Sequence, residues 1–459
     1  MQNYKQQFKG KRITIMGLGL LGRGLGYTKF LAECGADLVV TDLKTEEQLT
    51  TSVKALNKFK NIKFVLGEHR LEDFKNKDMI VKSAGVPLDS IYINEARKNN
   101  IPIEMDVSLF AKCAPLVMII GVTGTRGKSM TTALSYEILK ANEKLLKRKV
   151  YIGGNVRGVA TLPLLKKVKK GDILVCELDS WQLQGFGEAN LPDRQAGISP
   201  HISVFTTFMP DHMNYYKNSM ERYFEDKANI FKYQNKDDVL IILPEMKKLI
   251  KKEEVKGKLV IADGKNVSDW KFNVKGDHHR NNMACAVEVA KVLGIPESKI
   301  KKVISKFKDL EGRLQYLKTY KGIKIYNDNN ATTPEATIAG LEALSKDFAR
   351  TVLAKNKVIL ICGGADKGLP LDNFVKMVNT HCKAVIMIPG TGTERLLKSY
   401  ELKVKNEVGK ELNDIVKRAV KESKKGDTIL FSPAFASFGM FNNEYERNDL
   451  FIKIIKKLK

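Results

Sequence analysis

Short runs of β-branched and aliphatic residues alternate with longer helical stretches along the whole chain. The predicted strands are "RITIMGLG", "DLVVTD", "DMIVKSAGV", "LVMIIGVTG", "DILVCELDS", "ISVFTTF", "GIKIYND", "VILICGG", "AVIMIPG" and "TILFSPA". Runs that are apolar throughout are typical of strands buried on both faces of a sheet. Because helices supply the crossovers that parallel strands need, the alternation predicts an α/β fold built on parallel sheets.

The composition is that of a globular protein, with 459 residues, 43% hydrophobic and 28% charged. No apolar run approaches the roughly 20 residues of a membrane span, and the first residues, "MQNYKQQFKGKR", lack the apolar core of a signal peptide. The six scattered cysteines, with no C-x-x-C pair, favour a reducing compartment over a zinc site or disulfides. We therefore expect a cytoplasmic protein with no stable membrane association.

The formal net charge is +26, mostly from lysine. Such a field attracts anions, which include nucleic acid, anionic lipid and phosphorylated metabolites. The lysines are spread along the chain, and no basic stripe interleaved with aromatic residues occurs. This pattern favours solvated surface lysines, so no nucleic-acid partner is expected.

A glycine-rich loop follows the first predicted strand. Gly17, Gly19 and Gly22 form G-x-G-x-x-G before a helix, and Asp42 ends the next strand. Glycines at this spacing let the backbone approach a pyrophosphate, and the acid takes ribose hydroxyls. Alone, the pattern favours an NAD-dependent enzyme, and a tight turn that binds nothing is the alternative.

A second loop, "GVTGTRGKSMTT" at residues 121–132, is similar to the P-loop pattern G-x-x-x-x-G-K-[ST]. The distal glycine is missing, because Val122 stands there, so the stretch is a nucleotide site, a degraded one or an accident. Backbone N–H groups at a helix entrance bind anions, Lys128 would neutralise phosphate charge, and Ser129 would bind magnesium. The context of strand, loop and helix favours a nucleotide site.

The loops and a third series of strands indicate three nucleotide-fold units. We expect a Rossmann-like N-terminal domain at residues 1–112, a central P-loop domain at 113–313 and a Rossmann-like C-terminal domain at 314–459. A dehydrogenase needs no P-loop, and a simple ATPase needs no upstream Rossmann fingerprint. A chain with both a Rossmann fingerprint and a P-loop should bind two phosphorylated ligands and catalyse a reaction between them.

The short "TGTRGKS" loop, in this combination, resembles the Mur ligase family, whose loop usually reads T-G-T-N-G-K-[ST]-T-T. Other motifs similar to the family's occur in its order across nearly all of the chain. They are "ELDSWQL", "MPDHMN", "GDHHRNN", "DLEGRL", "YNDNNATTPEAT", "ICGGADKG" and "SPAFASFGMF". Within the family, "VVTDLKTEEQL", "VKSAGVPL" and "GGN" at 153–155 are similar to the members that add D-glutamate.

The resemblance implies an ATP-dependent amide ligase of peptidoglycan precursor synthesis. ATP, with two magnesium ions, would phosphorylate the carboxylate of UDP-N-acetylmuramoyl-L-alanine. The amine of D-glutamate would attack the resulting acyl phosphate, and phosphate would leave. Such a reaction depends on positioning three ligands and neutralising their charge. We expect a monomer.

The resemblance assigns catalytic roles in the central domain. Glu177 and His212 match family metal ligands, and Lys227 matches a lysine that becomes carbamylated and so offers oxygen ligands. With Lys128 they form the expected catalytic set, and Ser129 joins Glu177, His212 and carbamylated Lys227 as a metal ligand. A capping glutamate, a structural histidine and a surface lysine are the alternatives.

The resemblance also implies which residues bind the three substrates. The ATP-binding set is Gly124, Thr125, Arg126, Gly127, Lys128, Ser129, Met130, Asn282 at the adenine, Arg313 at the phosphates and Asp328 at the ribose. The UDP-sugar set is Gly19, Leu20, Leu21, Asp42, Ser83 and Asn155. The amino-acid set is Thr332, Lys367, Ser437 and Phe438, with helix capping as a second role for Ser437.

The sequence departs from the family pattern at several positions. Asn330 replaces a lysine expected beside phosphate or substrate, and Arg126 replaces the asparagine of the P-loop. We hypothesise that Arg126 partly substitutes for the lost lysine charge. Thr207 also stands where the family often has asparagine.

Three other functions remain open at this point. One is a ligase of the same family with another amino acid or acceptor, and the second is an NAD-binding oxidoreductase. The third is a non-catalytic nucleotide-binding protein derived from a ligase, which the Asn330 departure keeps open. Retention of Lys128, Glu177, His212 and Lys227 argues against the third.

Overall fold

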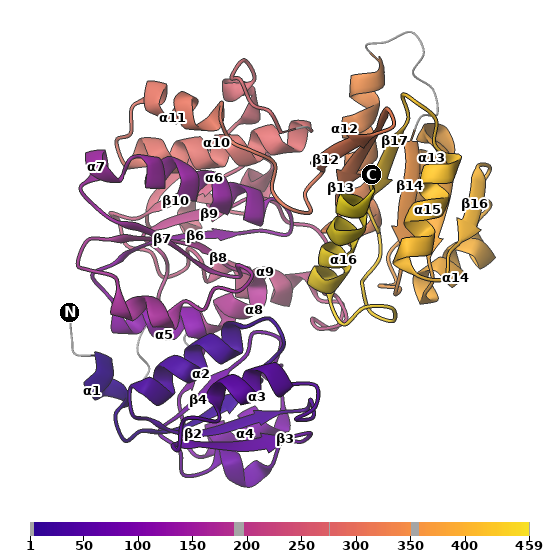
Figure 1. Ribbon diagram of the computed structural model, residues 1–459. Helices are drawn as coiled ribbons and strands as arrows, with labels where there is room; N and C mark the ends of the chain where they lie inside the picture. The colour runs from indigo at the N-terminus through magenta and orange to yellow at the C-terminus, as the bar shows by residue number, and fades with distance from the viewer. Residues whose placement is uncertain (1–3, 188–196, 275, 350–357, 459) are drawn as a thin grey trace. The chain divides into compact units, whose positions relative to one another are not determined.

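The computed structural model describes residues 4–187, 197–274, 276–349 and 358–458, which form three α/β regions, each around its own sheet (Figure 1). The fold class expected from the sequence is therefore confirmed. Single 3-10 turns supplement the α-helices: η1 Leu71–Phe74, η2 Leu162–Lys166, η3 Gln184–Phe186, η5 Pro244–Lys248, η6 Lys252–Glu254 and η7 Gly264–Val267. No helix among the described residues is long and apolar enough to cross a membrane.

The N-terminal sheet is parallel, in the order β3-β2-β1-β4-β5. Its strands are β1 Arg12–Met16, β2 Asp37–Asp42, β3 Ile62–Leu66, β4 Met79–Lys82 and β5 Ile103–Glu104. Its helices are α1 Tyr4–Phe8, α2 Arg23–Glu33, α3 Thr50–Leu56, α4 Ile91–Lys98 and α5 Asp106–Cys113. The central strand β1 is buried except at Arg12, so the loop after it is held by neighbours on both sides.

The middle sheet is also parallel, in the order β11-β10-β9-β6-β8-β7, and α6, α10 and α11 lie on one face (Figure 1). Its strands are β6 Met118–Thr123, β7 Val150–Gly154, β8 Ile173–Glu177, β9 Ile202–Phe205, β10 Val239–Ile242 and β11 Lys258–Ile261. Its helices are α6 Lys128–Ala141, α7 Glu143–Leu146, α8 Ser180–Leu183, α9 Met220–Ala228, α10 Asp277–Val292 and α11 Glu297–Ile304. This order places β8 and β9 on either side of β6.

The C-terminal sheet has the order β12-β13-β17-β14-β15-β16 and is parallel except at β12, which pairs antiparallel with β13. Its strands are β12 Gln315–Tyr320, β13 Ile323–Asn327, β14 Val358–Gly363, β15 Cys382–Ile388, β16 Lys405–Val408 and β17 Thr428–Phe431. Its helices are α12 Pro334–Ala349, α13 Asp372–His381, α14 Thr391–Ser399, α15 Leu412–Glu422 and α16 Glu444–Lys457. The antiparallel edge departs from the all-parallel expectation, because a short turn joins β12 to β13 directly.

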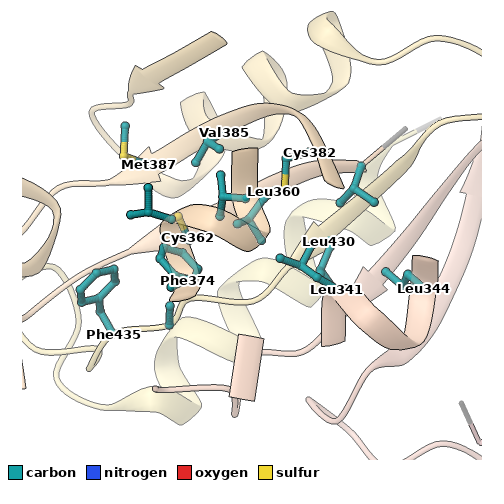
Figure 2. Close-up of a cluster of buried hydrophobic side chains, with 14 of the residues drawn as sticks. Leu341, Leu344, Leu360, Cys362, Phe374, Cys382, Val385, Met387, Leu430 and Phe435 are labelled. Carbon is teal, nitrogen blue, oxygen red and sulfur yellow. The ribbon is translucent and has the colours of Figure 1, made fainter. Parts of the chain in front are cut away.

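Two hydrophobic clusters cover the two faces of the C-terminal sheet. One contains side chains of α12, α13 and α14, and the other contains side chains of α15 and α16. Figure 2 shows the first cluster, in which Phe374 of α13 lies with Leu360 of β14 and Phe435 of the loop after β17. Phe435 is 2% exposed, so this loop is anchored in the core.

The chain divides into two compact units. The first comprises Met1–Lys271 and Arg280–Ser305 and holds the N-terminal and middle sheets, and the second comprises Phe272–His279 and Lys306–Lys459 and holds the C-terminal sheet. The domain boundaries expected at residues 112 and 313 stay predictions.

Candidate active site

The loop between β6 and α6 has the geometry of an anion-binding site. Gly127 is the N-cap of α6 with φ of 90°, and Gly124 has φ of 135°. A Cβ atom on Gly124 would lie 2.1 Å from Oγ1 of Thr206, and one on Gly127 would lie 2.3 Å from Oδ1 of Asn282. Both positions therefore require glycine. The N–H groups of residues 128–130 are in the first turn, where a helix offers donors to an anion.

Two threonines after β9 shape this loop. The N–H of Thr125 donates to O of Thr207 (2.7 Å), and the N–H of Arg126 donates to Oγ1 of Thr207 (2.9 Å). The Thr206 hydroxyl donates to O of Arg126 (2.5 Å). Thr206 was not predicted from the sequence, because its role depends on β9 lying beside β6. The only signal was the pair of threonines near the end of the predicted strand "ISVFTTF".

Two lysine ammonium groups converge on one carbonyl oxygen. Nζ of Lys128 lies 2.9 Å and Nζ of Lys227 lies 3.0 Å from O of Gly124. Lys227 is 1% exposed, and burial and then the charge of Lys128 lower its pKa well below the usual value. Burial also lowers the pKa of Lys128, and the Glu177 carboxylate opposes that shift. Because two cations this close repel each other, the position favours an anionic group beside them.

Asn155 and Glu177 lie together where β7 and β8 end. The N–H of Asn155 donates to O of Glu177 (2.7 Å), and its Nδ2 lies 3.5 Å from Oε1 of Glu177. Glu177 is 6% exposed. Asn155 was predicted to bind the UDP-sugar, and in the structure it contacts a predicted metal ligand.

Arg126 forms an ion pair within the same region. Its Nη1 lies 2.9 Å from Oδ2 of Asp211, and Nε2 of His212 lies 3.8 Å from the same oxygen. His212 has φ of 55°, and its ring centroid lies 4.6 Å from that of Trp181. Asp211 therefore supports both the loop and His212. Compensation for Asn330 by Arg126 stays a prediction.

The predicted magnesium ligands fit the chemistry of that ion. In the described part of the chain, no three His, Cys, Asp or Glu side chains form a preformed metal cage. The predicted donors are mainly oxygens: the Ser129 hydroxyl, the Glu177 carboxylate and a carbamate on Lys227. Magnesium prefers oxygen ligands, keeps several waters and is usually bound through one or two carboxylates and substrate phosphates. This donor set matches a magnesium–nucleotide site better than a protein-only metal site.

The N-terminal glycine loop is tied to β2. The N–H of Gly19, which has φ of 64°, donates to Oδ2 of Asp42 (2.9 Å), and the N–H of Lys44 donates to Oδ1 (2.9 Å). A Cβ atom at Gly17 would lie 2.8 Å from Cβ of Ser83, so the residue that follows β4 closes the loop on its other side. Leu20 is 43% exposed beside this loop, and Leu21 is half-buried. Asp42, predicted to bind uracil or ribose, also orders the loop.

The predicted amino-acid residues come together on three loops of the C-terminal sheet. Nζ of Lys367 donates to Oγ1 of Thr332 (3.3 Å). Ala365 and Ala436 exchange backbone hydrogen bonds of 3.0 and 3.1 Å, which places Ser437 and Phe438 next to the loop of Lys367. Phe438 is 62% exposed, whereas Ser437 is buried.

Ser437 does not cap a helix, so this alternative was wrong. The next helix, α16, begins at Glu444, and its N-cap is Asn443. Oδ1 of Asn443 accepts from the N–H groups of Tyr445 and Glu446, each at 3.0 Å.

Asp328 is buried where β13 ends. Its Oδ1 accepts from the N–H of Leu314 (3.0 Å), and its Oδ2 accepts from the Ser432 hydroxyl (2.9 Å). Burial raises the pKa of Asp328 to about 7, although these bonds and Arg313 oppose that shift. Arg313 and Asp328 thus lie together in the second compact unit, whereas the P-loop belongs to the first.

Three α/β regions, one with a short phosphate loop followed by a helix, define a nucleotide-dependent α/β enzyme. Comparison with known families agrees. Residues 11–104 match the N-terminal domain of MurD-like Mur ligases, residues 122–304 the Mur ligase middle domain, and residues 312–435 the glutamate ligase domain of Mur ligases.

Named relatives match over nearly their whole length. A UDP-N-acetylmuramoylalanine–D-glutamate ligase of Borreliella burgdorferi (strain ZS7) is 34% identical over 475 residues, which cover 98% of this chain and 99% of that protein. A protein of the same name from Roseiflexus sp. (strain RS-1) is 32% identical over 488 residues, with the same coverage. The chain therefore belongs to the Mur ligase family, and the resemblance noted in the sequence is confirmed.

A solved structure shares the fold. UDP-N-acetylmuramate-alanine ligase MurC from Thermotoga maritima matches with a TM-score of 0.62 over 98% of this chain and 100% of that one. The two sequences are only 17% identical, so this likeness concerns the fold alone.

Proposed function

We propose that this chain is an ATP-dependent ligase that joins D-glutamate to UDP-N-acetylmuramoyl-L-alanine in peptidoglycan precursor synthesis. Full-length relatives from several bacteria that carry this activity in their names support the proposal. One structural observation carries it: Lys128 and Lys227 converge on the carbonyl of Gly124 beside the N-terminus of α6. The Lys128 cation at a helix N-terminus suits the phosphates of a nucleotide, and the lowered pKa of the buried Lys227 amine suits its conversion to a carbamate.

In this proposal, residues 124–130 hold the phosphates of ATP, Asn282 contacts the adenine, and Arg313 and Asp328 contact the phosphates and ribose. Ser129, Glu177, His212 and a carbamate on Lys227 would hold two magnesium ions. Bound magnesium supplies charge neutralisation for the transferred phosphoryl group. The chain itself contributes position and fixed positive charge, chiefly from Lys128.

The reaction has two steps. An oxygen of the L-alanine carboxylate attacks the γ-phosphorus of ATP, and ADP leaves. The amine of D-glutamate then attacks the acyl carbon, loses a proton, and the C–O bond to phosphate breaks. Thr332, Lys367, Ser437 and Phe438 would hold D-glutamate so that its amine faces the acyl phosphate.

The UDP-sugar is assigned to the N-terminal glycine loop. The N–H groups around Leu20 and Leu21 would meet the pyrophosphate, and Asp42 and Ser83 border the same loop. Asn155 would line the path from this loop to the active centre, and its contact with Glu177 supports that place. The glycine fingerprint thus serves a nucleotide sugar in this proposal, in place of NAD.

We also propose that the chain acts as a monomer in the cytoplasm. Its substrates are nucleotides and nucleotide-linked precursors, and its six cysteines are free and buried, as a reducing compartment allows. Light scattering of the purified chain, with and without substrates, tests the monomer. A stable dimer at micromolar concentration would contradict it.

The activity is tested by phosphate release with ATP, magnesium and UDP-N-acetylmuramoyl-L-alanine, scanned over amino acids. We expect turnover with D-glutamate alone. Turnover with another amino acid would indicate a different specificity within the family. Absence of turnover with every amino acid would favour the non-catalytic alternative.

A further inference from the structure

The loop after β14 carries Lys367, and its first residues are held by neighbouring segments. The N–H of Gly363 donates to O of Pro433 (2.8 Å), and Ala365 is paired with Ala436. The N–H of Gly392, in the first turn of α14, donates to O of Gly364 (2.9 Å). The start of α14 therefore lies directly against this loop.

A side chain of α14 fixes the middle of the loop. Nη1 of Arg395 lies 2.7 Å from both carboxylate oxygens of Asp366, and its Nη2 donates to O of Leu369. Oδ1 of Asp366 also accepts from the N–H of Gly368 (3.0 Å), and the Asp366 N–H donates to Oγ1 of Thr391 (3.0 Å). One guanidinium thus contacts the Asp366 carboxylate before Lys367 and the Leu369 carbonyl after it.

The same ion pair controls charge beside Lys367. Burial alone would raise the pKa of Asp366, but the hydrogen bonds from Arg395 and from the Gly368 N–H outweigh burial and lower this pKa. The hydrogen bond to Asp366 in turn raises the pKa of Arg395. Both groups are therefore charged at neutral pH. Without Arg395, the Asp366 carboxylate would be an unneutralised anion next to Lys367, and it would repel a carboxylate substrate.

We propose that Arg395, acting through Asp366, is a positioning residue that holds Lys367 in place for a carboxylate of the amino-acid substrate. This inference rests on the proposed function, which assigns that substrate to Thr332 and Lys367. Contacts from two nitrogens of one planar guanidinium to two different groups suit this task, because they fix direction as well as distance. The substrate class is an amino dicarboxylic acid, whose second carboxylate needs a cation that does not move.

A second ion pair of the same domain provides a matched control. Nε of Arg418 lies 2.9 and 3.0 Å from the two carboxylate oxygens of Asp414, and Nη1 lies 2.9 Å from Oε2 of Glu407. Its side chains are 37% and 29% exposed, against 29% and 26% for Arg395 and Asp366. Arg418 lies on α15 and contacts Asp414 of α15 and Glu407 of β16.

The test compares steady-state kinetics of Arg395→Gln, Arg395→Lys, Asp366→Asn and Arg418→Gln. We expect Arg395→Gln to raise KM for D-glutamate at least about ten-fold, because small misplacements of a binding group have large effects. KM for ATP and for the UDP-sugar should stay within about two-fold of wild type if only the amino-acid site is disturbed. Asp366→Asn should act in the same direction, Arg395→Lys should restore part of the loss, and Arg418→Gln should match wild type.

Two results would overturn the inference. One is a KM for D-glutamate within two-fold of wild type in Arg395→Gln and Asp366→Asn. The other is an equal rise of all three KM values together with a lower Tm, which would indicate a general structural role. Failure of the proposed function would appear differently, as a wild-type enzyme that does not turn over with D-glutamate; the same comparison then uses the amino acid that supports turnover.

Discussion

Asp328 illustrates how burial changes the behaviour of a single carboxyl group. Its folded-state pKa of about 7 lies above the ordinary value of 3.8. Between these values the folded state holds a proton that the unfolded state has released. Raising the pH through this window therefore destabilises the folded state, and the stabilising contribution is complete only below about pH 4.

We predict that Asp328→Asn removes this pH dependence. The unfolding free energy of wild type should fall relative to the variant between pH 4.5 and 7.5, by up to the order of 4 kcal/mol. Urea denaturation of both proteins across this range measures the difference, and ATP binding should weaken in the variant. Glu401→Gln, at an exposed carboxylate, is the control and should show no such trend. A difference that stays constant with pH would contradict the prediction.

Lys227 provides a second prediction at the scale of one residue. If a carbamate forms on this buried amine, Lys227→Ala should lower kcat by about 100-fold, because an oxygen ligand of magnesium is lost. A short-chain carboxylate such as acetate should restore part of the activity by occupying the same space. Lys232→Ala, an exposed lysine a few residues further on, should behave like wild type. A fully active Lys227→Ala enzyme would exclude the carbamate.

At the scale of an element, the glycines of the loop between β6 and α6 lead to a prediction about ATP binding. Gly127 has φ of 90°, and a Cβ atom there would meet Oδ1 of Asn282 at 2.3 Å, whereas Gly171 has φ of 84° with nothing within 4 Å. Gly171→Ala should therefore show only the backbone strain, about 1–2 kcal/mol. Gly127→Ala should show more strain and should raise KM for ATP at least about ten-fold, since the loop must move away from its anion-binding shape.

Thermal unfolding and ATP kinetics of the two variants separate these effects. Equal losses of stability and unchanged KM for ATP in both would mean that the contact between the loop and Asn282 does not matter. A selective effect in Gly127→Ala would link the shape of the loop to nucleotide binding.

Secondary structure was predictable where strands are central and apolar. Every predicted strand is present, and "DLVVTD" and "LVMIIGVTG", with their apolar centres, contain β2 and β6. Most of the strands that were not predicted lie at sheet edges, such as β12 "QYLKTY" and β16 "KNEV". Edge strands have one neighbour and bear more polar residues, so their sequences resemble loops.

The contacts of the candidate site were less predictable than its residues. Motifs indicated Lys128, Glu177 and Lys367, because these residue types follow strands in recognisable patterns. The partners Thr206 and Arg395 come from other elements, and only the order of strands and the packing of α14 bring them to the loops. Pairing between distant segments is not encoded in local patterns.

At the scale of the whole molecule, the order of motifs identifies the family but not the division of the chain into compact units. Motif order across 459 residues identified the family, because a long series of weak motifs is specific as a set. The same order does not show how the chain divides into compact units: most of the first two predicted domains lies in one unit, and the third lies in the other together with residues 272–279 and 306–313.

The net charge of +26 leads to a prediction for the whole molecule. All three proposed substrates are anions, and the UDP-sugar and ATP carry more negative charge than D-glutamate. A positive field accelerates encounter with anions, and salt screens it, since the Debye length falls from about 30 Å at 0.01 M to about 8 Å at 0.15 M. We therefore expect kcat/KM for ATP and the UDP-sugar to fall several-fold over this range, and kcat/KM for D-glutamate to fall less.

Initial rates at fixed free magnesium, with sodium chloride as the only variable, measure this trend for each substrate. Sucrose at equal osmolality is the control, because it changes viscosity and water activity without screening charge. If the lysines act only as solvated surface groups far from the sites, the three values should change little and by equal factors. If the fall in kcat/KM with salt follows the charge of the substrate, the lysine-rich surface contributes to substrate capture. If kcat/KM does not change with salt, the surface lysines have no role in substrate capture.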